Sequence, residues 1–390
     1  MPEFEYWWLL GFPLFFGLGW IAARIDIRHL VHESRALPRS YFKGLNFLLN
    51  EQPDKAIEAF IEVVKVDPET IDLHFALGSL FRRRGEYDRA IRMHQNLLER
   101  EGLAKEQKVA ALAELGEDYL RAGILDRAEQ VFKQLEDTTL SAKARTDLLQ
   151  IYEQEKDWAR AVDMAKSLGG EPRSRDIAQY LCELAASAAA QSRPDAARRH
   201  LEAALEANRK CVRASLQLGD LEKDAGNPEK AIDSWKRIES QDPAYLALVA
   251  QRLLEAYRDA GRADEGLRLL AGYLERYPSL DLLDTVFQQT LDAKGVEAAY
   301  ALVRDELRRN PTLLGLDRLL EAQIIAAEDA DRRRDLELMR NLIHSHTRRL
   351  ARYRCETCGF KARQFHWHCP ACGGWETYPP RRTEEFDLTP

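Results

Sequence analysis

The chain has 390 residues, enough for two or three ordinary domains, and 45% of them are hydrophobic and 31% charged, which excludes an intrinsically disordered protein. The 57 Lys and Arg against 64 Asp and Glu give a formal net charge of -7, so we expect no nucleic acid partner, because general nucleic-acid binding favours a strongly basic surface.

The first predicted element is a transmembrane helix over residues 6–23, which read YWWLLGFPLFFGLGWIAA and carry no charge. As a helix this stretch would rise about 27 Å, close to the thickness of a bilayer's hydrocarbon core. Trp7, Trp8 and Trp20 suit the two membrane interfaces. A cleaved signal peptide is the rival interpretation, but it needs a basic start, whereas Glu3 and Glu5 precede this segment.

The charges on either side of this segment predict its orientation. Residues 1–5 carry no Lys or Arg, whereas residues 24–43 carry Arg24, Arg28, Arg35, Arg39 and Lys43. Because basic flanks stay in the cytoplasm, we expect residues 1–5 in the periplasm, residues 24–40 as a cytoplasmic linker, and the main body in the cytoplasm. Glycines within the segment either approach a partner helix or simply face lipid.

Residues 41–312 are predicted to form tetratricopeptide (TPR) repeats, each a pair of antiparallel helices of about 34 residues in total. The clearer repeats carry Gly44, Phe47, Ala56, Phe60 and Pro68; Leu77, Gly78, Phe81 and Ala90; Leu115, Gly116, Tyr119, Ala128 and Phe132; Leu218, Gly219, Ala231, Trp235 and Pro243; and Tyr257, Gly266, Leu270 and Pro278. The weaker repeats carry Tyr152 and Ala161; Leu184, Ala197, Leu201 and Ala204; and Ala299 and Pro311. Small residues let two helices approach closely, aromatic residues fill the space between pairs, and proline ends the second helix.

The predicted fold class is therefore an all-α TPR superhelical solenoid, with residues 313–350 as capping helices. The concave groove of such a stack usually binds other proteins, so we expect protein partners there. Polar residues of the repeats either line this groove or form solvated helix faces; they include Arg82, Arg83, Arg84, Asp118 and Arg121. Cys182 and Cys211 stand alone in helical sequence and are expected in the core.

The last element, residues 351–378, is a predicted rubredoxin-like metal knuckle, followed by a tail at 379–390. Cys355, Cys358, Cys369 and Cys372 have the spacing C-x2-C-x10-C-x2-C, in which four thiolates close a tetrahedral site for one Zn or Fe ion. The stretch between the pairs is much shorter than in electron-transfer rubredoxins, which favours structural Zn. Gly359 and Gly373 follow the two pairs and would allow tight turns.

Other interpretations of this segment are less favoured. A redox CxxC normally occurs singly on a thioredoxin-like fold, and a catalytic zinc keeps an open position that four cysteines would fill. His366 and His368 are alternative ligands, but we expect them to pack beside Trp367 instead. The ten Lys and Arg of residues 332–363 either balance the charge of the site and contact acidic repeats, which we prefer, or touch nucleic acid.

The order of these parts resembles the LapB (lipopolysaccharide assembly protein B, YciM) family of Gram-negative bacteria over the whole chain. The resemblance lies in YWWLLGFPLFFGLGW, in Ser40 to Asn50, and in YRCETCGF with HWHCPACGGW. It implies an inner-membrane, non-enzymatic adaptor that regulates lipopolysaccharide synthesis by presenting the deacetylase LpxC to the protease FtsH, restrained by the sensor PbgA (YejM).

The alternatives are a rubredoxin-type electron-transfer protein and an envelope assembly scaffold with other clients. The residues themselves show no HExxH motif and no nucleophile paired with a base, so we expect no enzyme.

Overall fold

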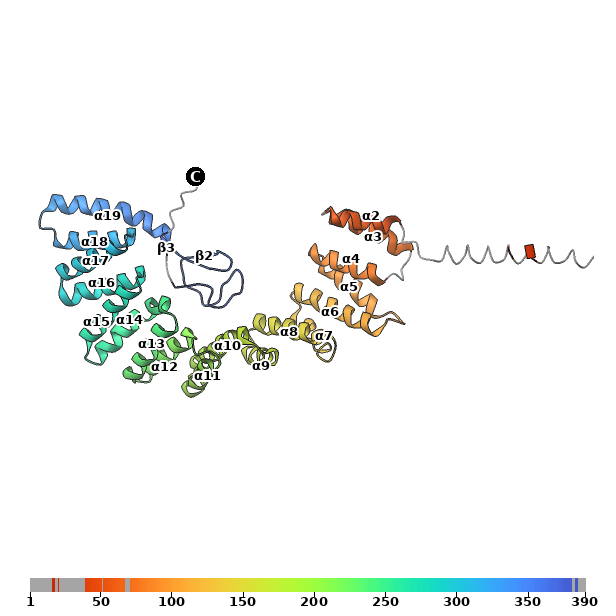
Figure 1. Ribbon diagram of the computed structural model, residues 1–390, viewed down its shortest axis with the longest axis horizontal. Coiled ribbons are helices and arrows are strands. Elements are labelled where there is room, and N and C mark those ends of the chain that lie inside the picture. Colours follow the sequence, from red (N-terminus) through yellow and green to blue (C-terminus); the bar gives the residue numbers. More distant parts are fainter. Residues whose placement is uncertain are drawn as a thin grey trace, which may run out of the picture. The chain divides into compact units, whose positions relative to one another are not determined.

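A computed structural model describes residues 16–17, 20, 39–50, 52–66, 71–380 and 383–384. The chain divides into two compact units, Met1–Ile151 and Tyr152–Pro390 (Figure 1). The predicted transmembrane helix and the linker after it lie almost entirely outside the described residues. None of the helices within the described ranges is both long and apolar enough to cross a bilayer.

The first unit consists of consecutive helix pairs, as the repeat pattern predicts. The pairs are α2 (Arg39–Leu49) with α3 (Pro53–Val66), α4 (Ile71–Arg83) with α5 (Tyr87–Leu98), and α6 (Lys105–Arg121) with α7 (Leu125–Lys133); α8 (Ser141–Glu155) follows.

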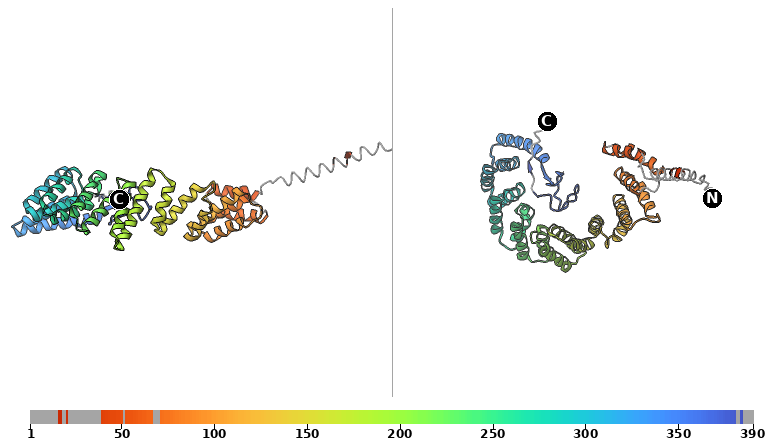
Figure 2. Two further views of the ribbon diagram at one scale, coloured as in Figure 1. Left: turned by 90° about the horizontal axis from the view of Figure 1, so that it is seen from below. Right: turned by 45° about the vertical axis from the view of Figure 1, so that its right-hand side comes forward.

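The second unit continues the same pattern. Its helices are α9 (Trp158–Leu168), α10 (Glu171–Ala190), α11 (Pro194–Ala207), α12 (Val212–Asp224), α13 (Pro228–Gln241), the short 3₁₀ helix η2 (Pro243–Tyr245), α14 (Leu246–Asp259), α15 (Ala263–Arg276), α16 (Leu280–Lys294), α17 (Val296–Arg309), α18 (Leu313–Ala326) and α19 (Ala330–Leu350). The weaker repeats therefore also fold as helix pairs, and residues 313–350 are helical. Helices α10 to α19 form an arc, seen from two directions in Figures 1 and 2.

Close approach of the two helices in a pair explains the glycine positions. A Cβ on Gly116 would lie 2.7 Å from Cε1 of Phe132, and a Cβ on Gly44 or Gly219 would meet the ring of Phe60 or Trp235 in the same way. The small residues predicted at the other crossing point are all buried: Ala56, Ala90, Ala128, Ala161, Ala197, Ala231 and Ala299. These contacts confirm the TPR prediction at its glycine and alanine positions, whereas Pro68 lies outside the described residues.

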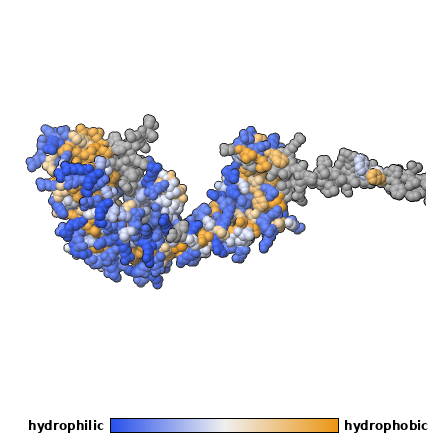
Figure 3. Space-filling view, viewed as in Figure 1, coloured by the Kyte–Doolittle hydropathy of each residue, from blue (hydrophilic) through white to orange (hydrophobic). Residues whose placement is uncertain are grey.

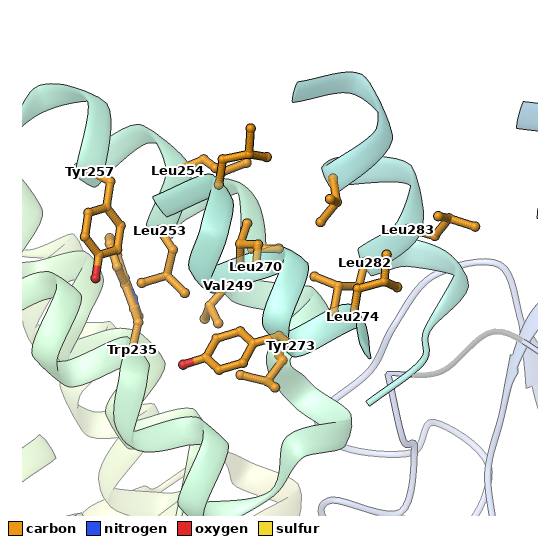
Figure 4. Close-up of a cluster of buried hydrophobic side chains, with 14 of the residues drawn as sticks. Trp235, Val249, Leu253, Leu254, Tyr257, Leu270, Tyr273, Leu274, Leu282 and Leu283 are labelled. Carbon is orange, nitrogen blue, oxygen red and sulfur yellow. The ribbon is translucent and has the colours of Figure 1, made fainter. Parts of the chain in front are cut away.

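The apolar residues of the later repeats merge into one core. Figure 4 shows Trp235 of α13, Leu253 and Tyr257 of α14, and Leu270 and Tyr273 of α15 directed into it. Hydrophilic residues cover most of the outer face of these helices (Figure 3), as expected when each apolar stripe faces its neighbour. Cys182 and Cys211 are buried as predicted, with their sulfur atoms 3.9 Å apart.

One repeat departs from the pattern, because His94 occupies the place of the aromatic residue over Gly78. Its Nδ1 lies 2.5 Å from Oδ2 of Asp118, and Asp118 also accepts a 2.7 Å hydrogen bond from Arg82. His94 and Asp118 are fully buried. The expectation that Asp118 lies in the groove or on a solvated helix face was therefore wrong; it closes a polar network inside the first unit.

The C-terminal segment of the second unit folds as a small three-stranded sheet in the order β2-β1-β3. Strand β1 (Ala351–Arg354) pairs antiparallel with β2 (Lys361–Ala362) and with β3 (Thr383–Glu384). Strand β3 lies within the residues that the sequence assigned to a tail, so the sheet reaches beyond residue 378. We call residues 351–384 the ribbon. It lies on the inner side of the arc of α10 to α19 (Figures 1 and 2).

Candidate metal centre

Two matching turns position the four cysteines. The N–H of Gly359 donates to the carbonyl of Cys355, and the N–H of Gly373 donates to the carbonyl of Cys369, each at 2.9 Å. Both glycines have positive φ angles, +75° and +69°, which residues with a side chain rarely adopt. The sequence prediction of two glycine-ended turns is therefore confirmed, and each turn directs its pair of thiols to the same point.

The four sulfur atoms form one compact cluster, all within 4.8 Å of one another. The distances from Cys355 to Cys372 and from Cys358 to Cys369 are both 3.8 Å. A Zn–S bond of about 2.3 Å in a tetrahedron separates neighbouring sulfur atoms by about 3.8 Å. The donor set and its spacing fit one tetrahedral metal ion, with Cys355 and Cys369 buried and Cys358 and Cys372 exposed.

The electrostatics of the cluster also suit a cation. Burial opposes ionisation of Cys355, but hydrogen bonds from Thr377 and from the backbone N–H groups of Cys358 and Thr357 outweigh it and lower the pKa of Cys355 to about 6. A backbone hydrogen bond from Phe360 favours the Cys358 thiolate, yet burial and the hydrogen bonds among the thiols raise the pKa of Cys358 to about 12. The hydrogen bonds that favour the Cys355 thiolate suit a metal ligand, because cysteine binds metal ions as the thiolate.

A small apolar core packs against the cysteine cluster. Tyr378 is completely buried, packs with Cys355 and Cys369, and donates a 2.8 Å hydrogen bond from its hydroxyl to the carbonyl of Phe360. The hydroxyl of Thr377 lies 3.3 Å from the sulfur of Cys355. This core is so small that the metal would supply much of the ribbon's stability.

The two histidines between the cysteine pairs are placed on aromatic rings. His366 packs edge-on against Tyr378, with ring centres 5.7 Å apart, and His368 packs against Trp375 at 4.4 Å. The expectation that both pack beside Trp367 was wrong, because the rings that they contact are those of Tyr378 and Trp375.

The ribbon is fixed to the repeats by aromatic contacts. Trp367 stacks on Tyr245 of η2 with ring centres 5.4 Å apart and planes within 8° of parallel. Phe365 meets Tyr245 edge-on at 6.2 Å. On the other side, Trp375 meets Trp158 of α9 edge-on at 6.0 Å. Tyr180 of α10 also meets Trp375, at 6.3 Å.

Polar contacts tie the same two surfaces together. Nε2 of Gln179 donates a 2.7 Å hydrogen bond to Oε1 of Glu376, although the two residues are 197 positions apart. Arg213 is held by a 2.7 Å ion pair with Glu183, and its guanidinium lies 5.9 Å from the ring of Trp367 and 5.7 Å from that of Trp375. Burial raises the pKa of Glu376 against the opposing charges of Arg175 and Arg213.

These docking residues were not identified from the sequence. Their partners are distant along the chain, so no local pattern marks Gln179, Arg213 or Tyr245. A cavity of about 790 Å³ remains beside the contact, lined by residues of both the repeats and the ribbon. The preferred explanation for the basic residues of 332–363 has support at one point, where Arg340 contacts Asp317 and Glu321 of α18.

Both the ribbon and the repeats are similar to known proteins. A family model described as a rubredoxin metal binding domain matches residues 353–380, and tetratricopeptide repeat models match 73–107 and 182–245. The chain is 35% identical over 376 residues to lipopolysaccharide assembly protein B of Escherichia coli, covering 95% of this chain and 96% of the relative. It is 31% identical over 390 residues to the protein of the same name from Haemophilus influenzae, covering 96% and 98%.

Among solved structures, a tetratricopeptide repeat protein from Parabacteroides merdae aligns with 73% of this chain and 97% of its own, at 16% identity and a TM-score of 0.27.

Proposed function

This chain belongs to the lipopolysaccharide assembly protein B family, and we propose that it is an inner-membrane adaptor that regulates lipopolysaccharide synthesis by promoting the degradation of LpxC by the protease FtsH. The observation that carries the proposal is the similarity to that family over 95% of the chain, which takes in both the repeats and the ribbon. By resemblance, the sensor PbgA (YejM) would restrain it.

The architecture supports an adaptor more than an enzyme. A stack of helix pairs offers long surfaces for other proteins, and the ribbon adds a second surface on the inner side of the second unit. Four thiolates would fill a tetrahedral metal site and leave no position for substrate, which suits a structural ion, with Zn favoured over Fe.

The metal site would affect the adaptor role because it keeps the ribbon folded and packed against the repeats. Trp367 and Trp375 lie between or beside the cysteine pairs, so their positions depend on the folded ribbon. Loss of the metal would unfold the ribbon and remove its contacts with Tyr245 and Trp158, exposing these aromatic residues. We expect a partner to recognise the surface that the ribbon and the repeats form together.

Membrane anchoring by the predicted helix at 6–23 would contribute through concentration. Confining adaptor and protease to one plane raises the frequency of their encounter, so that each contact need not be strong. A chain starting at Arg24 should therefore fold and bind LpxC but support little degradation at normal expression.

Reconstitution tests the proposal directly. Purified FtsH and LpxC are incorporated in proteoliposomes with and without this protein, and LpxC is followed over time. LpxC degradation should be faster with the full chain than with FtsH alone. A chain in which Cys355 and Cys372 are replaced by Ser should change the rate of FtsH alone little, and no degradation should occur without FtsH. If the full chain leaves the rate unchanged while it is shown to bind LpxC, it does not act as the adaptor for this protease.

A further inference from the structure

The first helix of the repeat array turns an apolar face toward solvent. Phe42, Leu45 and Leu49 of α2 are 55%, 37% and 82% exposed. Their spacing of three and four residues places them on one side of the helix. Hydrophobic residues gather at this end of the first unit (Figure 3). The terminal helices of a repeat array normally carry a polar outer face, so this face is suited to contact another apolar phase.

The opposite side of α2 accounts for the packing of the first repeat. Gly44 is buried and lies against Phe60 of α3, and Phe47 packs against the core that contains Phe60. The exposed face is therefore additional to what the repeat fold requires. The apolar side chains on it remain exposed with the helix folded against α3.

The sequence that leads into α2 is basic, which favours an anionic surface. Residues 24–43 contain five Lys or Arg and only two acidic residues, Asp26 and Glu33. Lys43 lies within α2 itself, next to Phe42. An apolar helix face in a basic stretch of sequence is typical of helices that lie in the interface of membranes with anionic lipids.

The position of α2 in the chain selects the membrane as the occupant. Residues 24–38 separate α2 from the predicted transmembrane helix, and fifteen residues span at most about 50 Å even when fully extended. Helix α2 is thus tethered close to the bilayer. We propose that Phe42, Leu45 and Leu49 insert into the anionic cytoplasmic surface of the inner membrane and seat the first repeat on it; this inference rests on the inner-membrane anchoring proposed above.

The last helix supplies a matched control. Leu338 and Met339 of α19 are 63% and 52% exposed, so they are as accessible as the α2 residues. They lie some 290 residues further along the chain, and no predicted membrane segment adjoins them. If exposure alone caused contact with lipid, both helices would show it.

Photolabelling of the full chain tests the contact. The protein is incorporated in nanodiscs of phosphatidylethanolamine and phosphatidylglycerol that contain a diazirine-bearing phospholipid, irradiated, digested with trypsin and analysed by mass spectrometry. The lipid label should appear on the peptide of residues 44–55 and remain at background on the peptide of residues 335–340. Replacing phosphatidylglycerol with phosphatidylcholine should reduce labelling of 44–55 severalfold.

Two variants test whether the labelling depends on the apolar face of α2. Leu49→Glu places a carboxylate in the proposed contact and should lower labelling of 44–55 about tenfold, whereas Leu338→Glu should leave it unchanged. Circular dichroism should show the same helix content in both, because each position is exposed.

The inference is overturned if residues 44–55 carry no more label than residues 335–340, or if Leu49→Glu has no effect. Crosslinking of Lys43 to Lys43 of a second copy, without lipid label, would identify the face as a contact between copies and overturn it as well. Strong labelling of residues 1–24 with none on 44–55 refutes only this inference, whereas failure of the chain to enter nanodiscs refutes the membrane anchor too.

Discussion

Replacing Trp367 and Trp375 together with Ala should release the ribbon from the repeats while the cysteine site stays complete. The two rings provide three of the ribbon's aromatic contacts with the repeats, to Tyr245, Trp158 and Tyr180, and the edge-on contact of Phe365 with Tyr245 remains in the variant. Neither tryptophan is a candidate metal ligand. The double variant thus separates docking from metal binding, which substitution of a cysteine cannot do.

The expected size of the effect follows from these contacts. The three aromatic pairs that the two tryptophans make with the repeats each contribute roughly 0.7 kcal/mol beyond the area that they bury, within the usual range for such pairs. The rings are only partly buried, so their area adds about 2 kcal/mol more. The total loss of about 4 kcal/mol corresponds to about a thousandfold shift from docked toward free ribbon.

Hydrogen exchange and limited proteolysis measure this shift, with metal content and helix content as controls. The double variant should keep its metal and its helices, while protease cleavage near residues 346–352 and exchange in α10 and η2 both increase. Leu338→Ala, at an exposed site on α19, should change none of these. Unchanged cleavage and exchange in the double variant would refute the conclusion that the aromatic contacts hold the ribbon.

Three further predictions concern metal, packing and pH. Replacing Cys355 and Cys372 with Ser should abolish binding of one metal per chain in elemental analysis and leave repeat helicity intact; retained metal would contradict the four-thiolate site. Gly219→Ala should lower the free energy of unfolding by about 1–3 kcal/mol because a Cβ there meets a buried tryptophan ring. Gly272→Ala should raise the free energy of unfolding, because a Cβ there meets only the end of the Arg276 side chain, at 4.0 Å. Equal effects of the two substitutions in denaturant titrations would contradict the packing argument. Burial raises the pKa of Asp147 from 3.8 to about 6. Because the folded protein then holds this proton more tightly than the unfolded chain, the unfolding free energy should fall by up to about 2 kcal/mol as pH rises from 4 to 6, and then level off. Asp147→Asn should flatten this pH profile, and an unchanged profile would exclude Asp147 as its source.

Short-range patterns made most of the fold predictable from the sequence. The glycine, alanine and aromatic positions of a repeat lie within one helix pair, so the spacing of Gly116, Ala128 and Phe132 in the sequence predicts that they meet in the structure. The four cysteines are similarly local, with two pairs ten residues apart. Packing within one helix pair of some 34 residues fixes residue types at fixed spacings, and a single sequence shows these spacings.

Contacts between distant segments left no such pattern. Gln179 and Glu376 look like ordinary polar residues until the fold brings them to 2.7 Å. His94 was missed because it takes an aromatic position with a polar side chain. Only its contact with the buried Asp118, which also accepts a hydrogen bond from Arg82, explains why that is tolerated. The exposure of Leu45 and Leu49 on α2 was not predicted, since a helical pattern does not show whether a neighbouring helix covers each face.

The central claim, that this protein promotes LpxC degradation, is tested most directly by the half-life of LpxC in cells depleted of it. Depletion should lengthen the half-life of LpxC and raise lipopolysaccharide. The full chain should restore both, whereas a chain with Cys355 and Cys372 replaced by Ser should restore neither. An LpxC half-life that stays the same on depletion would contradict the account.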